Sequence, residues 1–231
     1  MRRRWHQAAA AGALALAATA CGGGGGAVGS GATSPTTTTV DDHALADRAN
    51  LRLSDFPTEW KASPLGTGTL EASEASDRAY ADCMGRPHPD QIRTARADSE
   101  DFSAQDTRRV TSNVQVVRTA EIARDDFAAL RTDKALECRK VQIDTEFQRQ
   151  VPDAVPKTTI ERFDLPQFGD QSLAFRVLAV GQVQGQEVRT YIDLAFIQKG
   201  RAELSGAFIN RTSPFPADLE KTLLQRMVGR A

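Results

Sequence analysis

The sequence predicts an α+β fold, in which an antiparallel sheet packs against helices as a two- or three-layer sandwich. Three apolar runs lie between residues 172 and 210 and are separated by Gln184-Gly185 and Lys199-Gly200. This is the pattern of a β-meander, in which consecutive antiparallel strands are joined by tight turns. Apolar and polar residues alternate within the first two runs, which indicates that helices cover a face of the sheet.

Further strands are expected near residues 114–118 and 159–165. Four helices are expected to provide the cover, over residues 70–84, 119–130, 134–150 and in the segment after Pro216. In the first of them, Ala72, Ala75, Ala79 and Cys83 recur at helical spacing. The polar stretch 88–109 lacks periodicity, so it is expected to be an exposed excursion anchored by Phe102. The charged side chains of Asp126, Arg139 and Lys140 are expected to face solvent.

Composition limits the possible classes of function. The chain has 231 residues, with 29 basic and 30 acidic side chains and a net charge of -1. This balance gives no overall field that would attract nucleic acid, so nucleic acid is not an expected partner. With three cysteines and three histidines in all, neither a metal site nor another cofactor is expected. No catalytic motif such as Gly-x-Ser-x-Gly occurs in a fitting context, so the chain is not expected to be an enzyme.

The first residues have the form of an export signal. Three arginines are followed by a run over residues 8–20 that is mostly Ala and Leu and too short to span a bilayer. Small residues then lead into Cys21, which resembles the lipobox of bacterial lipoproteins. That resemblance implies cleavage of a signal peptide at residues 1–20, lipid on Cys21 and anchoring to the cell membrane. Ala18 occupies a place where the family favours Leu, so signal cleavage without lipid, which gives a secreted protein, stays open.

Residues 21–42 are rich in Gly, Ser and Thr and poor in large apolar side chains. Such a segment cannot offset the entropy of ordering, so it predicts a disordered tether after the lipidated cysteine. A single globular extracytoplasmic domain is expected over residues 51–231, where Leu51 and Leu53 begin the apolar alternation.

Cys83 and Cys138 are the two cysteines left in the exported part of the chain. An oxidising compartment favours a disulfide between them, and two separate buried thiols are the alternative. By the loop-entropy relation, closing a loop of about 55 residues stabilises the fold by about 4 kcal/mol.

Arg176 and Asp193 are the candidate ligand-binding residues. If Gln184-Gly185 is a two-residue hairpin loop, Arg176 lies directly opposite Asp193 on the same face of the sheet. The pair has two interpretations. It is either a partly shielded ion pair that fixes strand register, or an anion site in which Asp193 orients the guanidinium.

The order of LRLSDFP, the Cys83 helix, FAALR, GDQSLAFR, YIDLAFIQKGR and PFPADLE resembles secreted actinobacterial lipoproteins. Their domains are similar to the extracellular sensor domains of PknH-type receptor kinases and, more distantly, to PsbP-like lipoproteins. From about Leu51 to the end, this resemblance implies an α+β sandwich with a binding or sensing role. We therefore expect a membrane-anchored, non-catalytic lipoprotein that binds a small ligand or an envelope component. An accessory protein that docks on another envelope protein is the alternative, and a hydrolase is the third class.

Overall fold

The computed structural model describes residues 39–104, 107–150, 157–163, 165–183 and 186–231. The expected signal peptide, Cys21 and the Gln184-Gly185 turn lie outside the described residues. Within them, no helix is both long enough and apolar enough to cross a membrane.

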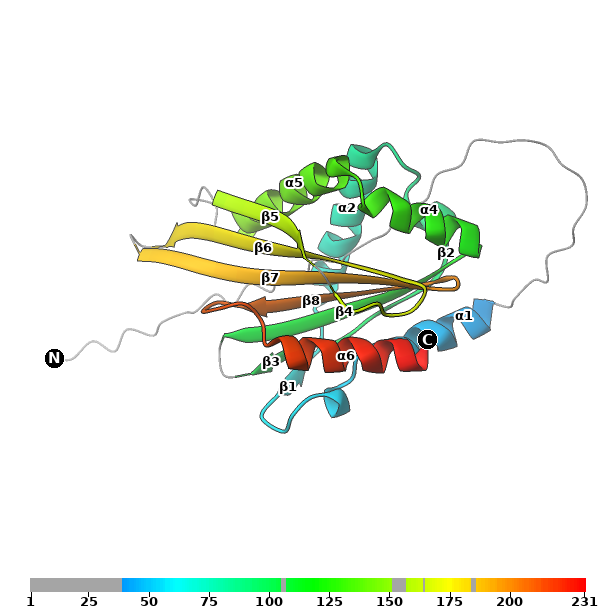
Figure 1. Ribbon diagram of the computed structural model, residues 1–231, viewed down its shortest axis with the longest axis horizontal. Helices are drawn as coiled ribbons and strands as arrows, with labels where there is room; N and C mark the ends of the chain where they lie inside the picture. The colour runs from blue at the N-terminus through cyan, green and yellow to red at the C-terminus, as the bar shows by residue number, and fades with distance from the viewer. Residues whose placement is uncertain (1–38, 105–106, 151–156, 164, 184–185) are drawn as a thin grey trace, which may run out of the picture.

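The described residues form an eight-stranded antiparallel sheet with the order β1-β3-β4-β8-β7-β6-β5, in which β2 also pairs with β4. The edges of this path are therefore β1 and β5. The strands are β1 (Lys61–Ser63), β2 (Arg93–Asp98), β3 (Asp101–Ala104), β4 (Arg108–Val117), β5 (Lys157–Phe163), β6 (Gln171–Val183), β7 (Gln186–Lys199) and β8 (Ala202–Asn210). β6, β7 and β8 form the predicted meander, so the α+β sandwich with its antiparallel sheet is confirmed (Figure 1).

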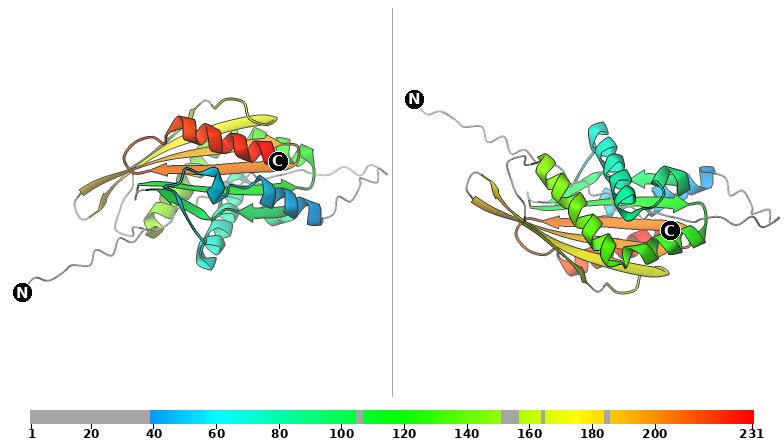
Figure 2. Two further views of the ribbon diagram at one scale, coloured as in Figure 1. Left: turned by 90° about the horizontal axis from the view of Figure 1, so that it is seen from below. Right: turned by 90° about the horizontal axis from the view of Figure 1, so that it is seen from above.

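Helices cover both faces of the sheet, so the sandwich has three layers (Figures 1 and 2). α2, α4 and α5 lie on one face, while α1 and α6 lie on the other. The helices are α1 (Thr39–Ala49), α2 (Thr67–Met84), α3 (Pro89–Ile92), α4 (Ala120–Leu130), α5 (Asp133–Gln150) and α6 (Ala217–Arg230), with a short 3-10 turn at Leu53–Asp55. α2 ends where the sequence predicts, because Gly85 takes the left-handed conformation with φ 70°.

Strand alternation sends apolar side chains to two separate cores. On one face, Phe175 and Leu194 pack in the same buried cluster as Tyr80 of α2 and Ile143 of α5. On the other face, Ile197 and its neighbours share a cluster with three α6 side chains, Leu223, Leu224 and Met227. The sheet is thus buried on both sides.

The folded part begins earlier than the sequence suggests. α1 starts at Thr39, inside the predicted tether and before Leu51. Asp42 of this helix is 2% exposed, and it forms an ion pair with Arg201, which is 159 residues further along the chain. Since a charged contact this distant leaves no local pattern, the tether boundary predicted at residue 42 was wrong.

The stretch 88–109 was also interpreted wrongly. It contains β2 and β3, which pair with β4, instead of forming an exposed excursion. Ala95 and Ala97 are the buried residues of β2, and alternating alanines give a weak hydrophobic signal. Phe102 is fully buried, which confirms its predicted role as an anchor.

Candidate functional site

A groove between α2 and α5 has room for a small ligand. Its volume is about 290 Å³, close to the small end of the range for ligand pockets, which is about 300–1,000 Å³. Its apolar wall contains Ala72, Ala75, Ala79, Tyr80, Cys83, Cys138 and Val141, and its polar residues are Ser76, Gln142, Thr145, Glu146 and Arg149.

The groove exists because α2 presents small side chains to α5. Ala72, Ala75 and Ala79 share one face of α2, because they recur at the helical spacing that predicted this helix. The last two are exposed along the groove. Opposite them, Val141 of α5 is 61% exposed, which is unusual for a branched apolar side chain.

A disulfide holds the two helices together at this groove. Cys83 of α2 and Cys138 of α5 are bonded, with an S–S distance of 2.05 Å and a Cα–Cα distance of 5.8 Å. The predicted pairing is therefore present in the structure. Both cysteines line the groove, so the covalent link fixes the separation of its walls.

Most polar groups of the groove lie along α5, and Ser76 lies on α2. Arg149 donates two hydrogen bonds to the carboxylate of Glu146, at 3.0 and 2.6 Å, and this contact raises the pKa of Arg149. Gln142 donates from Nε2 to Oγ of Ser76 at 2.7 Å and so links the two helices. These residues give the mostly apolar groove a polar rim.

Arg139 lies directly behind the groove. It is 1% exposed, although the sequence suggested a solvated residue. Its guanidinium carbon lies 4.0 Å from the ring centre of Tyr80 and 5.3 Å from that of Phe196. Its Nη1 donates to Oε1 of Gln142 at 2.5 Å. Lys140, in contrast, is partly exposed and pairs with Asp144. The prediction was wrong for Arg139 because helical periodicity alone does not show which long polar side chain turns inward.

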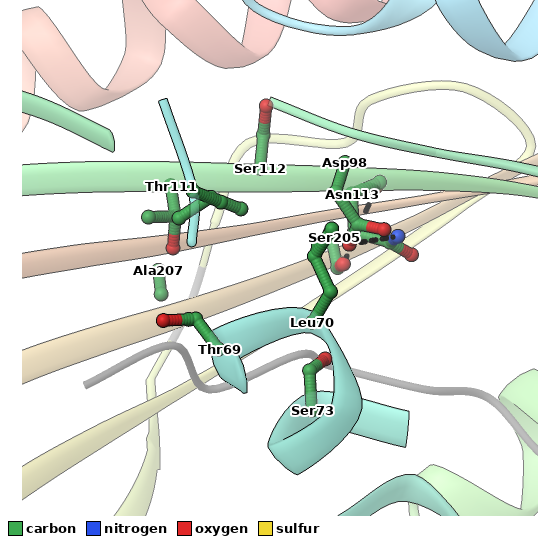
Figure 3. A pocket seen from close by; sticks show the side chains of 10 residues that line it. Thr69, Leu70, Ser73, Asp98, Thr111, Ser112, Asn113, Ser205 and Ala207 are labelled. Atoms are coloured by element: carbon green, nitrogen blue, oxygen red, sulfur yellow. Dashed lines mark hydrogen bonds between the residues drawn. The ribbon is translucent and has the colours of Figure 1, made fainter. Parts of the chain in front are cut away.

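A second hollow lies between the start of α2 and strands β4 and β8, and it is much smaller (Figure 3). Its volume is about 20 Å³, enough for about one water molecule. Hydroxyl and amide groups surround it, from Thr69, Ser73, Thr111, Ser112, Asn113 and Ser205. Asn113 donates to Asp98 at 2.8 Å, so the polar groups partly satisfy one another. This hollow is too small for an organic ligand.

Arg176 and Asp193 lie on the opposite face of the sheet from the groove. They are paired in the predicted register, and Nε and Nη2 of Arg176 donate to the two carboxylate oxygens, both at 2.7 Å. Asp193 is fully buried, whereas 31% of the Arg176 side chain is exposed. The Arg176 guanidinium also lies 4.7 Å from the Phe163 ring centre. Its hydrogen bonds with Asp193 raise its pKa. The geometry is that of an ion pair that locks β6 to β7.

Glu220 of α6 lies beside this ion pair. Its side chain is 3% exposed. Burial, with a smaller contribution from Asp193, raises its pKa to about 8. The carboxyl group of Glu220 is therefore largely protonated at neutral pH, which sequence patterns give no means of predicting.

A further acidic pair lies on the groove side of the sheet. Asp126 of α4 and Glu203 of β8 are buried next to each other, although the sequence placed Asp126 in solvent. Nη2 of Arg86 donates to Asp126 at 2.7 Å. Burial raises the pKa of Asp126 to about 7 and raises that of Glu203 as well. Among the described residues, no group of three or more His, Cys, Asp or Glu could hold a metal ion.

Comparison with known proteins gives a distant structural likeness. No family model matches the chain, and no curated protein matches it significantly. Among solved structures, it is similar to the extracellular domain of PknH from Mycobacterium tuberculosis. That likeness has a TM-score of 0.40 and 12% sequence identity, and it covers 81% of this chain and 95% of that chain. Function must therefore be argued from the site.

Proposed function

We propose that this protein is a non-catalytic, extracytoplasmic binding protein that holds an apolar or amphipathic small molecule between α2 and α5. The groove itself is the observation that supports this function. Its wall combines small and apolar side chains with a few polar groups, which is the usual composition of a small-molecule site.

The disulfide supports both the location and the mode of binding. Disulfides persist in oxidising compartments, in agreement with the export signal read from the sequence. The bond between Cys83 and Cys138 also keeps the groove open before a ligand arrives. Preorganisation of this kind lowers the entropic cost of binding.

In this proposal the protein is anchored through lipid on Cys21. The anchor would keep the groove close to a membrane, which is a source of apolar and amphipathic molecules. Release of the protein without lipid would leave the groove and its ligand class unchanged.

Blocking the groove tests the proposed function. Ala79→Trp should fill the space between the helices and abolish binding of 1-dodecanol in a calorimetric titration. Ala128→Trp is the matched control, because Ala128 is an exposed alanine of α4 that does not line the groove. Native mass spectrometry of the protein purified from its own membrane should show a co-purifying molecule that Ala79→Trp loses. If neither 1-dodecanol nor any co-purifying molecule binds the wild-type protein, the proposed function is wrong.

A further inference from the structure

Arg139 has hydrogen-bond donors that the described residues leave without an acceptor. Only its Nη1 is bonded, to the neutral amide oxygen of Gln142. Nε and Nη2 are buried with no hydrogen-bond partner, and no described acidic side chain forms an ion pair with Arg139. A buried charge without a counter-charge is strongly destabilising, because the charge has lost its hydration without gaining a partner. Its contacts with the Tyr80 and Phe196 rings offset only part of that cost.

Other arginines in the chain use the same edge of the guanidinium differently. In Arg96, Arg149 and Arg176, the Nε and Nη2 groups together contact both oxygens of one carboxylate. This is the two-pronged geometry that makes arginine suited to carboxylates and phosphates. Arg139 is more deeply buried than these three, and no acidic side chain in the described part of the chain contacts the same edge of its guanidinium.

The position of Arg139 relates its guanidinium to the groove. Two side chains that touch its guanidinium, Tyr80 and Gln142, also line the groove. Gln142 is held by Ser76 on the facing helix, through hydrogen bonds of 2.7 and 3.3 Å. Rotation of the Gln142 amide would leave Nη1 of Arg139 without its neutral acceptor, on the side of the guanidinium where Gln142 lines the groove. An anion that replaced the amide would contact Nη1 and the adjacent Nη2 at the end of the guanidinium. These hydrogen bonds would be charge-assisted, and such bonds are about twice as strong as neutral ones.

We infer that the ligand is an amphiphile with an anionic head, and that Arg139 binds the head while the apolar wall of the groove binds the tail. This inference rests on the proposed function and specifies its ligand class. The shared chemistry is a single carboxylate or phosphate group on an apolar chain. Gln142 acts as a replaceable neutral partner that holds the guanidinium until the anion arrives.

Probes with the same chain and different heads test the inference. Calorimetric titration of the full-length protein at about pH 7 should show dodecanoate or dodecyl phosphate binding at least about tenfold tighter than 1-dodecanol. Whichever acid binds more tightly identifies the head as carboxylate or phosphate. If 1-dodecanol binds as tightly as both acids, the inference is wrong while the proposed function stands.

Three variants locate the anion contact. Arg139→Met should bring the affinity ratio of acid to alcohol to about one, and Arg139→Lys should lower it because lysine lacks the planar fork. Gln142→Glu should also lower the ratio, because it places a competing carboxylate beside the guanidinium. This variant keeps Arg139, so it tests the anion contact even if Arg139→Met does not fold. Arg124→Met is the control, because Arg124 is exposed on α4. If Arg149→Met removes the preference and the Arg139 and Gln142 variants keep it, the anion binds at the rim and the inference is overturned.

Discussion

Replacing Glu220 with glutamine should remove a large part of the dependence of stability on pH. The side chain is 3% exposed, and burial, followed by the nearby charge of Asp193, raises its pKa from 4.5 to about 8. Because this pKa is higher in the folded than in the unfolded chain, folding favours the protonated carboxyl group. The stabilisation is fully present below a pH of 4.5 and is lost as the pH rises through about 8.

The two pKa values set the size of the effect. Through Glu220 alone, the free energy of unfolding should fall by about 3 kcal/mol between about pH 5 and about pH 8. Glutamine has nearly the same shape and does not ionise. The difference in stability between Glu220→Gln and the wild-type protein should therefore shift by about 3 kcal/mol in favour of the variant over that range. Asp126 and Glu203, whose pKa values are also raised, contribute equally to both proteins and cancel in the subtraction.

Equilibrium urea unfolding without reductant, repeated across this pH range, measures the shift. Glu121→Gln is the matched control, because Glu121 is exposed in the first turn of α4. Its difference from the wild-type protein should stay constant with pH. If the difference for Glu220→Gln is equally constant, the carboxyl group is ionised in the folded protein, and the account of its burial is wrong.

Three other perturbations have defined outcomes. Cys83→Ser and Cys138→Ser should each lower the free energy of unfolding by about 4 kcal/mol. The double variant should be little less stable than either single variant, because all three remove the same bond. Two free thiols, detected by alkylation and mass measurement without reductant, would contradict this prediction. Arg176→Met should cost about 3 kcal/mol, more than Asp193→Leu, because it leaves a fully buried carboxylate unpaired. Thermal unfolding should show that the double variant regains much of this loss, and a double variant as unstable as Arg176→Met would exclude a purely structural pair. Cys21→Ala should release the protein from the membrane or block its maturation, and unchanged partition into membranes would exclude lipid on Cys21.

The sequence predicted best the parts of the fold that depend on alternation between neighbours. The meander follows from apolar residues at every second position, and the pairing of Arg176 with Asp193 follows from counting outward from Gln184-Gly185. These inferences need only local geometry. Cover of one face by helices follows equally well from the apolar stripes, such as the one on α6, whereas the choice between two and three layers was left open.

The elements that the sequence missed depend on contacts between distant residues. α1 carries few large apolar residues and is held partly by the ion pair between Asp42 and Arg201. β2 has alanines where a stronger pattern would have valine or isoleucine. The alanine stripe of α2 predicted its helix correctly, but the stripe did not show that Ala75 and Ala79 line a groove. Whether Arg139 turns inward depends on the packing of α5 against the sheet, which no spacing rule contains.

The edge strands of the sheet, β1, β2 and β5, have a consequence for how the protein behaves when it is concentrated. α1 lies beside β2, where Thr94 donates to Asp42. β1 has only three residues, so it offers little backbone to another molecule. Along β5, the side chains of Lys157, Glu161 and Arg162 are exposed, and a second strand that paired with β5 would have to accommodate charges of both signs. Short or charged edges of this kind oppose edge-to-edge polymerisation. We therefore expect the protein to tolerate crowding without forming β-linked aggregates, even where many copies share a small area.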